Sequence, residues 1–270
     1  MDVLLTGAAG GIGKVTTELL VAQGFRVFAA DIQHTVPAHV GEDQGRVIPL
    51  AMDVTRLDAV QSASDQVRRY TDGLDAIINN AGWFDQFPLA EGTHEQFEQI
   101  VSVNVLAAQR IFRTFFPLLH ARKGRLINVS SEAALALMPL QAYGMSKRML
   151  DAYTDVLRQE LALLGMRAIT IRPGAHLTPF IQRSIDVIDD LDETSIYAKP
   201  LRNVQQQASR ILRNVNREPK EVGEVILRAL ISPHPKREYW VNVSLAFRVL
   251  RVLPASWREA LFRSLLMKNG

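Results

Sequence analysis

Short apolar runs alternate with segments of helical periodicity along most of this chain, and this alternation constrains the fold more than any other feature. The pattern predicts strands at Val3–Thr6, Arg26–Ala30, Val47–Met52, Leu74–Asn79, Arg125–Val129, Ala168–Arg172 and Glu238–Val243. It predicts helices at Lys14–Gln23, Ala59–Tyr70, Glu95–His120 and Tyr143–Leu164. Because strands separated by helices pair in parallel through right-handed crossovers, we expect an α/β fold with a doubly wound parallel sheet and helices on both faces.

The chain of 270 residues is long enough for one large α/β domain, and we expect a single domain over residues 1–270. With 47% hydrophobic and 22% charged residues, it can bury a sizeable core. Two segments depart from the alternation. Residues 178–217, acidic at first and then basic and Gln-rich, are expected to cover the carboxyl edge of the sheet as an insertion. Residues 244–270 form a basic tail.

A glycine-rich turn follows the first expected strand. Gly7, Gly11 and Gly13 lie between that strand and the first expected helix, in the spacing G-x-x-x-G-x-G. Glycines there permit a tight turn and a close approach to a dinucleotide pyrophosphate, which the free amides of the helix N-terminus stabilise. Glycines that serve only an ordinary strand–helix loop are the alternative. We expect Gly7, Gly11, Ile12 and Gly13 to bind the cofactor.

Asp31 ends the second expected strand, 18 residues after Gly13. A carboxylate at this point accepts hydrogen bonds from an adenosine ribose and repels a 2′-phosphate. Gly10 supplies no positive charge for such a phosphate, so NAD is favoured over NADP as the cofactor. Asp53 and Val54 follow the third strand and are expected at the adenine edge, although this segment could equally form a helix-capping turn.

Tyr143 and Lys147 are four residues apart in a segment of helical periodicity, which places them on one helix face. A free tyrosine has a pKa of about 10, too high for acid/base catalysis at neutral pH. A nearby ammonium favours the phenolate and lowers that pKa. The pair is therefore a candidate acid/base site, but such a pair is also common in helices where both residues are structural.

Several motifs occur together in a fixed order: the Gly7/Gly11/Gly13 turn, Asn79-Asn80-Ala81-Gly82, Asn104, Ser130-Ser131, Tyr143-x-x-x-Lys147, and Arg172-Pro173-Gly174 followed by Thr178. In order and spacing they resemble the short-chain dehydrogenase/reductase family, over roughly residues 1–180. The resemblance implies a Rossmann-type fold. It also implies an NAD-dependent oxidoreductase that interconverts a secondary alcohol and a ketone by hydride transfer.

The resemblance implies four catalytic residues. Tyr143 would be the general acid in reduction and the general base in oxidation. Lys147 would lower the pKa of that tyrosine and hold the nicotinamide ribose. Ser131 would donate a hydrogen bond to the substrate oxygen; Ser130 is the alternative, because neighbouring strand residues face opposite sides. Asn104 would hold a water that links Lys147 to solvent.

The resemblance also implies further cofactor contacts. Asn80, with Ala81 and Gly82, would steady the central strand and line the adenosine pocket. Pro173 and Thr178 would lie against the nicotinamide, with Thr178 bonding its carboxamide. His176 would line the pocket through its backbone, a catalytic histidine being the less favoured alternative.

Apolar side chains stand on both sides of these motifs. One set follows the Asn-Asn-Ala-Gly turn and the other lies in the insertion: Trp83, Phe84, Phe87, Phe180, Ile181, Ile185, Val187, Ile188 and Leu191. They are either the walls of a substrate pocket or core and interface residues. If they line a pocket, a bulky hydrophobic alcohol or ketone is favoured over a sugar.

The charge distribution bears on partners. The net charge is only +3, while residues 202–270 carry 13 Lys and Arg against 5 Glu, a balance of +8. A solvated surface is the favoured interpretation, and nucleic-acid binding is not expected because no interleaved aromatic and basic motif occurs. The tail alternates apolar and basic residues and could rest on a membrane surface, although packing on the domain or on a partner subunit is favoured. The family resemblance implies a homodimer or homotetramer through the two long helices.

Other functions are disfavoured by composition. The chain has no cysteine, which excludes disulfides and thiolate nucleophiles, and its six histidines are scattered, so no metal site is expected. No apolar run reaches the length of a membrane span and no leader pattern opens the chain, so a cytoplasmic location is expected. The remaining alternatives to an enzyme are a non-catalytic NAD-binding regulator and a peripheral membrane protein.

Overall fold

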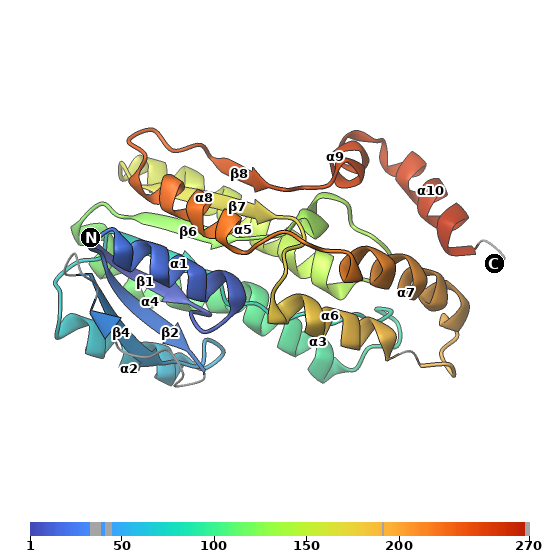
Figure 1. Ribbon diagram of the computed structural model, residues 1–270, viewed down its shortest axis with the longest axis horizontal. Helices are drawn as coiled ribbons and strands as arrows, with labels where there is room; N and C mark the ends of the chain where they lie inside the picture. The colour runs from blue at the N-terminus through green and yellow to red at the C-terminus, as the bar shows by residue number, and fades with distance from the viewer. Residues whose placement is uncertain (33–38, 41–44, 191, 268–270) are drawn as a thin grey trace.

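The computed structural model describes residues 1–32, 39–40, 45–190 and 192–267, which form one α/β domain around a single sheet (Figure 1). The strands lie in the order β3-β4-β2-β1-β5-β6-β7-β8. Their bounds are β1 Asp2–Thr6, β2 Arg26–Asp31, β3 His39–Val40, β4 Arg46–Ala51, β5 Ala76–Asn79, β6 Arg125–Val129, β7 Arg167–Pro173 and β8 Glu238–Val241. The strand order reverses between β1 and β5, which is where a doubly wound sheet forms its ligand crevice.

The sheet departs from the predicted parallel arrangement at one edge. The pairs that β1, β2 and β4–β8 make with one another are parallel, as expected. The short strand β3 pairs antiparallel with β4 and was not predicted. Two residues are too few to show a hydrophobic period, so the sequence pattern carried no sign of this strand.

Helices cover both faces of the sheet. Their bounds are α1 Gly11–Ala22, α2 Leu57–Arg68, α3 His94–Val101, α4 Ala107–Ala121, α5 Ala142–Leu163, α6 Pro179–Asp189, α7 Ala198–Arg213, α8 Lys220–Ile231, α9 Leu245–Val252 and α10 Ala255–Met267. Leu4 packs with side chains of α2, α4 and α5, whereas its neighbours Val3 and Leu5 pack with α1 and α8. Burial on both faces explains why these strands are continuous apolar runs.

The predicted helix Glu95–His120 is interrupted. The chain forms α3, then a π-helical turn at Ser102–Leu106, and only then α4. A π-turn inserts an extra residue without breaking the apolar face, so periodicity alone predicted one helix. The turn contains Asn104, which the interruption places next to the site described below.

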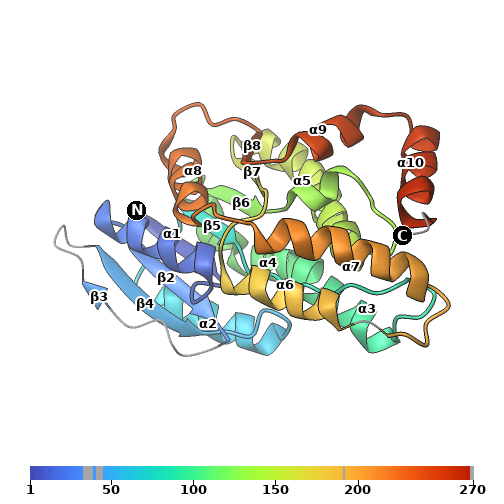
Figure 2. The same cartoon turned by 45° about the vertical axis from the view of Figure 1, so that its right-hand side comes forward.

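The two segments that depart from the alternation lie beyond the carboxyl ends of the strands (Figures 1 and 2). Of the expected insertion 178–217, the described residues form α6 and α7, which pack on each other. Leu191 lies outside the described residues. The tail forms α9, which contacts the 3₁₀ turn Glu132–Leu135, and α10, which packs on α7. No helix in the described ranges combines the length and apolarity needed to cross a membrane.

Candidate active site

The polar motifs of the sequence meet at one edge of the sheet. Gly7 directly follows β1, Asp31 ends β2, Asn79 ends β5, Ser130 directly follows β6 and Pro173 ends β7. Because the carboxyl ends of parallel strands share an edge, the topology brings these residues around one crevice. A cavity of about 700 Å³ occupies this crevice.

Most residues predicted for the cofactor line this cavity: Gly7, Gly11, Ile12, Asp31, Asp53, Val54, Asn80, Ala81, Gly82, Tyr143, Lys147, Pro173, His176 and Thr178. Gly13 lies behind its wall, where a Cβ would stand 1.9 Å from the Gly7 carbonyl oxygen. The glycine at 13 is therefore required by the close approach of α1 to the turn, as the packing argument predicts.

The glycine turn has the geometry of an anion cradle. Gly7 has a φ of 65°, in the left-handed region that favours glycine. Helix α1 begins at Gly11, and its N-cap residue Gly10 offers no side chain to the first amides of the helix. Those amides are therefore available to a phosphate, and the cradle fits the pyrophosphate of a dinucleotide.

The Asn-Asn-Ala-Gly turn is fastened to the glycine turn. Asn80 Nδ2 donates to the carbonyl oxygens of Thr6 and Gly7, both at 3.1 Å. The Thr6 hydroxyl accepts from the amides of Asn80 and Ala81 at 3.1 and 3.2 Å. These bonds hold two neighbouring strand ends together, so Asn80 steadies the floor of the cavity.

The two acidic residues of the predicted adenosine side are both fixed by backbone amides. Asp31 Oδ2 accepts from the Ala9 amide at 2.9 Å, which ties the end of β2 to the glycine turn. Asp53 Oδ1 accepts from the amide and hydroxyl of Thr55, at 2.8 and 2.6 Å. Asp53 thus closes a local turn ahead of α2 and does not cap that helix, whose N-cap is Arg56 without a side-chain bond; Asp53 also lines the cavity.

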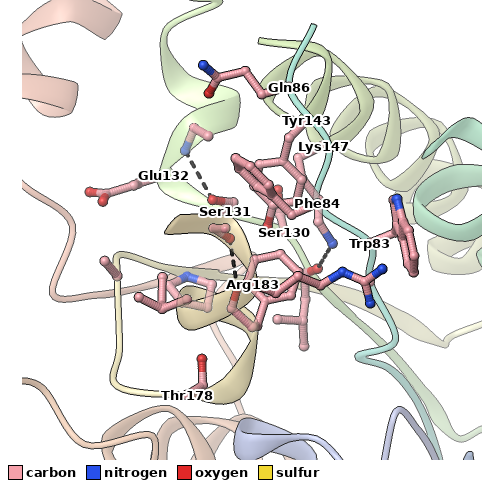
Figure 3. A pocket seen from close by; sticks show the side chains of 18 of the residues that line it. Trp83, Phe84, Gln86, Ser130, Ser131, Glu132, Tyr143, Lys147, Thr178 and Arg183 are labelled. Atoms are coloured by element: carbon pink, nitrogen blue, oxygen red, sulfur yellow. Dashed lines mark hydrogen bonds between the residues drawn. The ribbon is translucent and has the colours of Figure 1, made fainter. Parts of the chain in front are cut away.

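Tyr143 and Lys147 lie on the first turns of α5 and face the cavity (Figure 3). Lys147 Nζ donates to the Val129 carbonyl oxygen at 3.0 Å and lies 5.8 Å from the centre of the Tyr143 ring. Burial lowers the pKa of Lys147 to about 8, and the negative charge of Asp151 opposes that shift. The lysine is 3% exposed, so its charge acts in a medium with little screening.

The environment of Tyr143 shifts its pKa in the direction opposite to that implied for the family tyrosine. Its ring centre lies 5.3 Å from that of Phe84 and 5.6 Å from that of Phe180. Burial raises the pKa of Tyr143 to about 12, while hydrogen bonding with Ser131 opposes this shift. Desolvation outweighs the hydrogen bond, and the negative charge of Glu132 adds to the rise, while the Lys147 ammonium is directed to a backbone carbonyl.

The two serines after β6 face different partners. Ser131 lines the cavity beside Tyr143 and accepts a hydrogen bond from the Ala133 amide at 3.2 Å (Figure 3). Ser130 lines the cavity too, but it is 4% exposed and its hydroxyl accepts from Arg172 at 3.4 Å. The placement favours Ser131 as the residue that reaches a substrate oxygen.

Asn104 is 2% exposed and lies behind the cavity wall. It holds the backbone of Trp83, directly after the Asn-Asn-Ala-Gly turn, in place. Its carboxamide accepts from the Trp83 amide and donates to the Trp83 carbonyl, both at 2.8 Å, and it also donates to Ser146 at 2.8 Å. A Cβ on Gly82 would lie 3.5 Å from both Asn104 Oδ1 and Lys147 Nζ. Gly82 thus leaves space between the amide and the ammonium.

His176 is held as a neutral side chain. Asn242 Nδ2 lies 3.2 Å from its Nε2, so Nε2 accepts and Nδ1 donates to the Gly174 carbonyl at 2.9 Å. Burial lowers the pKa of His176, consistent with the neutral form. Its backbone carbonyl accepts from Thr178 Oγ1 at 3.2 Å, so the histidine positions Thr178.

Two charged features of the site were not predicted. Arg172 is 5% exposed and bonds Asp151 at 2.9 Å, Glu238, and the Ser131 carbonyl at 3.0 Å. Asp151 is four residues after Lys147 on α5, a spacing that could have indicated it. Arg183 stacks on Trp83, with its guanidinium carbon 3.5 Å from the ring centre (Figure 3).

The apolar set from the sequence divides in the structure. Trp83, Phe84, Phe180, Ile181 and Ile188 line the cavity, whereas Phe87, Ile185 and Val187 do not. Phe87 packs on Gly92 instead, and Ile185 is 5% exposed in the interior. The cavity continues along α7 and the tail, beside residues not predicted for it: Val204, Gln207, Ala208, Ile211, Leu212, Phe247, Phe262, Leu265 and Leu266.

The described residues contain no group of three or more His, Asp or Glu side chains placed to hold a metal ion.

Comparison with known proteins agrees with the geometry. The family model described as short chain dehydrogenase matches residues 2–186. The human 17-beta-hydroxysteroid dehydrogenase type 6 is 26% identical over 94% of this chain and 85% of its own.

Two solved bacterial structures share the fold over nearly the whole chain. A short chain dehydrogenase from Burkholderia cenocepacia, in complex with NADP, has a TM-score of 0.74 and 24% identity, covering 99% of this chain and 98% of its own. A short chain dehydrogenase/reductase from Burkholderia phymatum, in complex with NAD, has a TM-score of 0.77 and 19% identity, covering 96% and 94%. Relatives of this fold thus occur with either cofactor.

Proposed function

The chain belongs to the short-chain dehydrogenase/reductase family, oxidoreductases that act on CH–OH groups with a nicotinamide cofactor, and we propose that it interconverts a hydrophobic secondary alcohol and its ketone with NAD. The observation that carries the proposal is the position of Tyr143. Its ring stands in one cavity between the glycine cradle on one side and an apolar wall on the other. A proton donor there lies between a cofactor and a substrate.

The protein's residues supply the proton chemistry. Bound NAD would accept or return the hydride. In ketone reduction, the Tyr143 hydroxyl donates its proton to the carbonyl oxygen, and a pKa of about 12 keeps that hydroxyl protonated at neutral pH. Ser131 donates a second hydrogen bond to the same oxygen and stabilises the charge that develops there.

Lys147 is the third residue of the proposed proton-transfer site, beside Tyr143 and Ser131. Its ammonium stabilises the phenolate left after proton transfer, and it lies at the cofactor side of Tyr143, where it can hold the ribose hydroxyls. Asp151 and Arg172 position the set: Asp151 favours the charged form of Lys147, and Arg172 fixes the Ser131 backbone. Asn104, placed against Gly82, leaves room for the proposed water between its amide and Lys147.

The preference for NAD rests on charge at the end of β2. Asp31 is fixed beside the glycine turn, where it accepts from a ribose and repels a 2′-phosphate. Of the described residues that line the cavity, Lys147 and Arg183 are the only Lys or Arg, and both lie at the Tyr143–Trp83 side. No described cation lining the cavity therefore compensates a phosphate beside Asp31.

A hydrophobic substrate is favoured by the lining beyond Tyr143. Phe84 and Phe180 pack on the tyrosine, and aliphatic residues of α7 and α10 extend the wall. Burying apolar ligand surface there contributes about 25 cal/mol per Å². The human relative acts, by its name, on a hydroxysteroid, a bulky secondary alcohol of this kind.

We also propose assembly through the long helices. Leu106, which ends the π-helical turn before α4, is 43% exposed, and Val156 and Leu163, on α5, are 56% and 87% exposed. Apolar side chains on two helices of one face fit a homodimer or homotetramer contact. Sedimentation-equilibrium mass above that of one chain would support it.

The test is cofactor reduction by the purified protein. We expect NADH formation from NAD and a panel of secondary alcohols, with steroid and alicyclic alcohols preferred over sugars. The same reactions with NADP should be at least tenfold less efficient. Equal or better efficiency with NADP would overturn the cofactor assignment, and turnover of sugars in preference to apolar alcohols would overturn the substrate class.

A further inference from the structure

The tail helices α9 and α10 have two distinct faces. On the inner side, Phe247, Phe262, Leu265 and Leu266 line the same cavity as Tyr143. On the outer side, apolar residues face solvent. The segment is therefore both part of the cavity wall and an apolar surface, and each face needs its own explanation.

The outer face of α9 is an apolar stripe. Leu245, Val249 and Val252 are spaced by four and three residues, which places them on one side of the helix. They are 76%, 47% and 78% exposed, and no residue of α9 is buried. A helix this amphipathic, with its apolar stripe in water, is unusual unless another surface covers it.

Helix α10 also carries apolar side chains that face solvent. Trp257 and Leu261 are four residues apart and are 67% and 39% exposed, whereas Phe262 is 6% exposed. The bond from Asn203 Nδ2 to the Leu266 carbonyl, at 2.7 Å, fixes the inner face of the helix on α7. The exposure of Trp257 and Leu261 is therefore maintained by the packing of α10.

Basic residues flank this surface. Residues 244–267 contain Arg248, Arg251, Arg258 and Arg263 against one acidic residue, Glu259, a balance of 4 − 1 = +3. The guanidinium carbons of Arg248 and Arg251 lie 5.7 and 5.2 Å from the Trp240 ring centre, which fixes two of these charges at the flank of α9. Apolar residues with arginines beside them suit a surface that is apolar within and anionic outside.

We propose that the outer face of α9 and α10 binds an anionic lipid surface. Leu245, Val252 and Trp257 enter the apolar layer while the arginines contact the headgroups, each near-surface cation adding to the attraction. A second copy of this chain fits less well, because a two-fold contact through this face would bring two positively charged tails together.

The inner face of α9 and α10 suggests why the protein would bind lipid. This step rests on the proposed function. Since α9 and α10 carry residues of the cavity wall, the lipid-bound protein would have its substrate cavity at the membrane. An apolar alcohol or ketone dissolves mainly in lipid, so it would reach Tyr143 from the bilayer rather than from water.

The test is vesicle binding by the full chain, measured by co-sedimentation. Vesicles of phosphatidylcholine with about a third phosphatidylserine should bind the protein at least tenfold more tightly than vesicles of phosphatidylcholine alone, and high salt should weaken that binding. Trp emission should shift to the blue on binding, and Trp257→Phe should remove the shift. Activity is not the readout, so the outcome stands apart from that of the proposed function.

Two triple variants separate this face from exposed apolar residues in general. Leu245→Ser/Val252→Ser/Trp257→Ser should reduce binding at least tenfold. The control Leu57→Ser/Leu89→Ser/Ile231→Ser, at positions 51%, 60% and 51% exposed outside the tail, should bind as the unaltered chain does. Unchanged thermal unfolding in both variants establishes that they fold.

Three outcomes would overturn the proposal. One is absence of binding to anionic vesicles by the unaltered chain. Another is equal loss of binding in both triple variants. The third is a tail-dependent dimer in solution without lipid binding, which would assign the face to a second copy of this chain.

Discussion

The base of the active site and its cover consist of different kinds of residue. The base, at the carboxyl edge of the sheet, consists of glycine backbone and buried polar side chains such as Lys147, Asp151 and Arg172, each 3–6% exposed. The cover, formed by α6, α7 and the tail, is mainly apolar on the side facing the cavity, with Arg183, Ser184 and Gln207 as its polar members. Buried charges need fixed partners, whereas an apolar wall needs only volume.

Because of this difference, we expect the base to determine the chemistry and the cover to determine substrate selection. Side chains of the base are held by hydrogen-bond and ion-pair partners at short distances, among them Lys147 by the Val129 carbonyl and Arg172 by Asp151, so their positions suit chemistry that depends on geometry. The cover is also fastened by polar bonds, among them Ser209 to Asp189 at 2.6 Å, but its cavity side is mainly apolar and determines which molecules fit. Changes in the base should therefore affect the cofactor and the proton, and changes in the cover should affect the substrate alone.

The largest effect is expected in the glycine turn. In Gly13→Ala the new Cβ would lie 1.9 Å from the Gly7 carbonyl oxygen, so the cradle must distort. We expect at least a hundredfold loss of NADH affinity, measured by the fluorescence of bound NADH. In the matched control Gly10→Ala the Cβ would lie 3.4 Å from the same oxygen, and affinity should change less than threefold. If the two variants reduced NADH affinity equally, the glycine turn would behave as an ordinary strand–helix loop and not as a specific phosphate cradle.

The next effect is the pH dependence of the two reaction directions. Tyr143 has its pKa raised to about 12 by burial, so the phenolate needed as base in alcohol oxidation is scarce at neutral pH. The oxidation rate should rise about tenfold per pH unit below about pH 8, where Lys147 begins to lose its proton. Ketone reduction needs the protonated phenol and should stay nearly constant over that range. A flat oxidation profile, with hydride transfer rate-limiting, would contradict this assignment.

The smallest effect should arise in the cover. Leu265 lines the cavity from α10, so Leu265→Ser should raise KM for an apolar alcohol about tenfold, the cost of losing about 1.4 kcal/mol of apolar contact, with kcat changed less than threefold. The control Trp257→Ser, on the outer face of the same helix, should leave KM unchanged in lipid-free solution. A fall in kcat with constant KM for Leu265→Ser would mean that the cover takes part in the chemistry.

The base was largely predictable from the sequence and the cover was not. Glycine spacing and the residues at strand ends are local signals that the topology brings to one edge, and Gly7, Asp31, Asn80 and Tyr143 line one cavity there. The proposed roles of these residues still await the tests above.

The cover lacked such signals, because any apolar residue can serve as wall or core. Phe87 and Phe180 are indistinguishable by pattern, yet only Phe180 reaches the cavity. The pKa of Tyr143 is another case. Four-residue spacing indicated the lysine, but not the two phenylalanines from distant segments whose packing raises the tyrosine pKa.

The most direct test of the account is single-turnover hydride transfer in Tyr143→Phe. The variant keeps the ring that packs on Phe84 and Phe180 and removes only the hydroxyl, so NADH affinity should stay within threefold of the unaltered chain. The rate of ketone reduction should fall by about a factor of 10² to 10⁴, the contribution of a positioned proton donor. Reduction at the original rate with NADH bound would contradict the claim that Tyr143 transfers the proton.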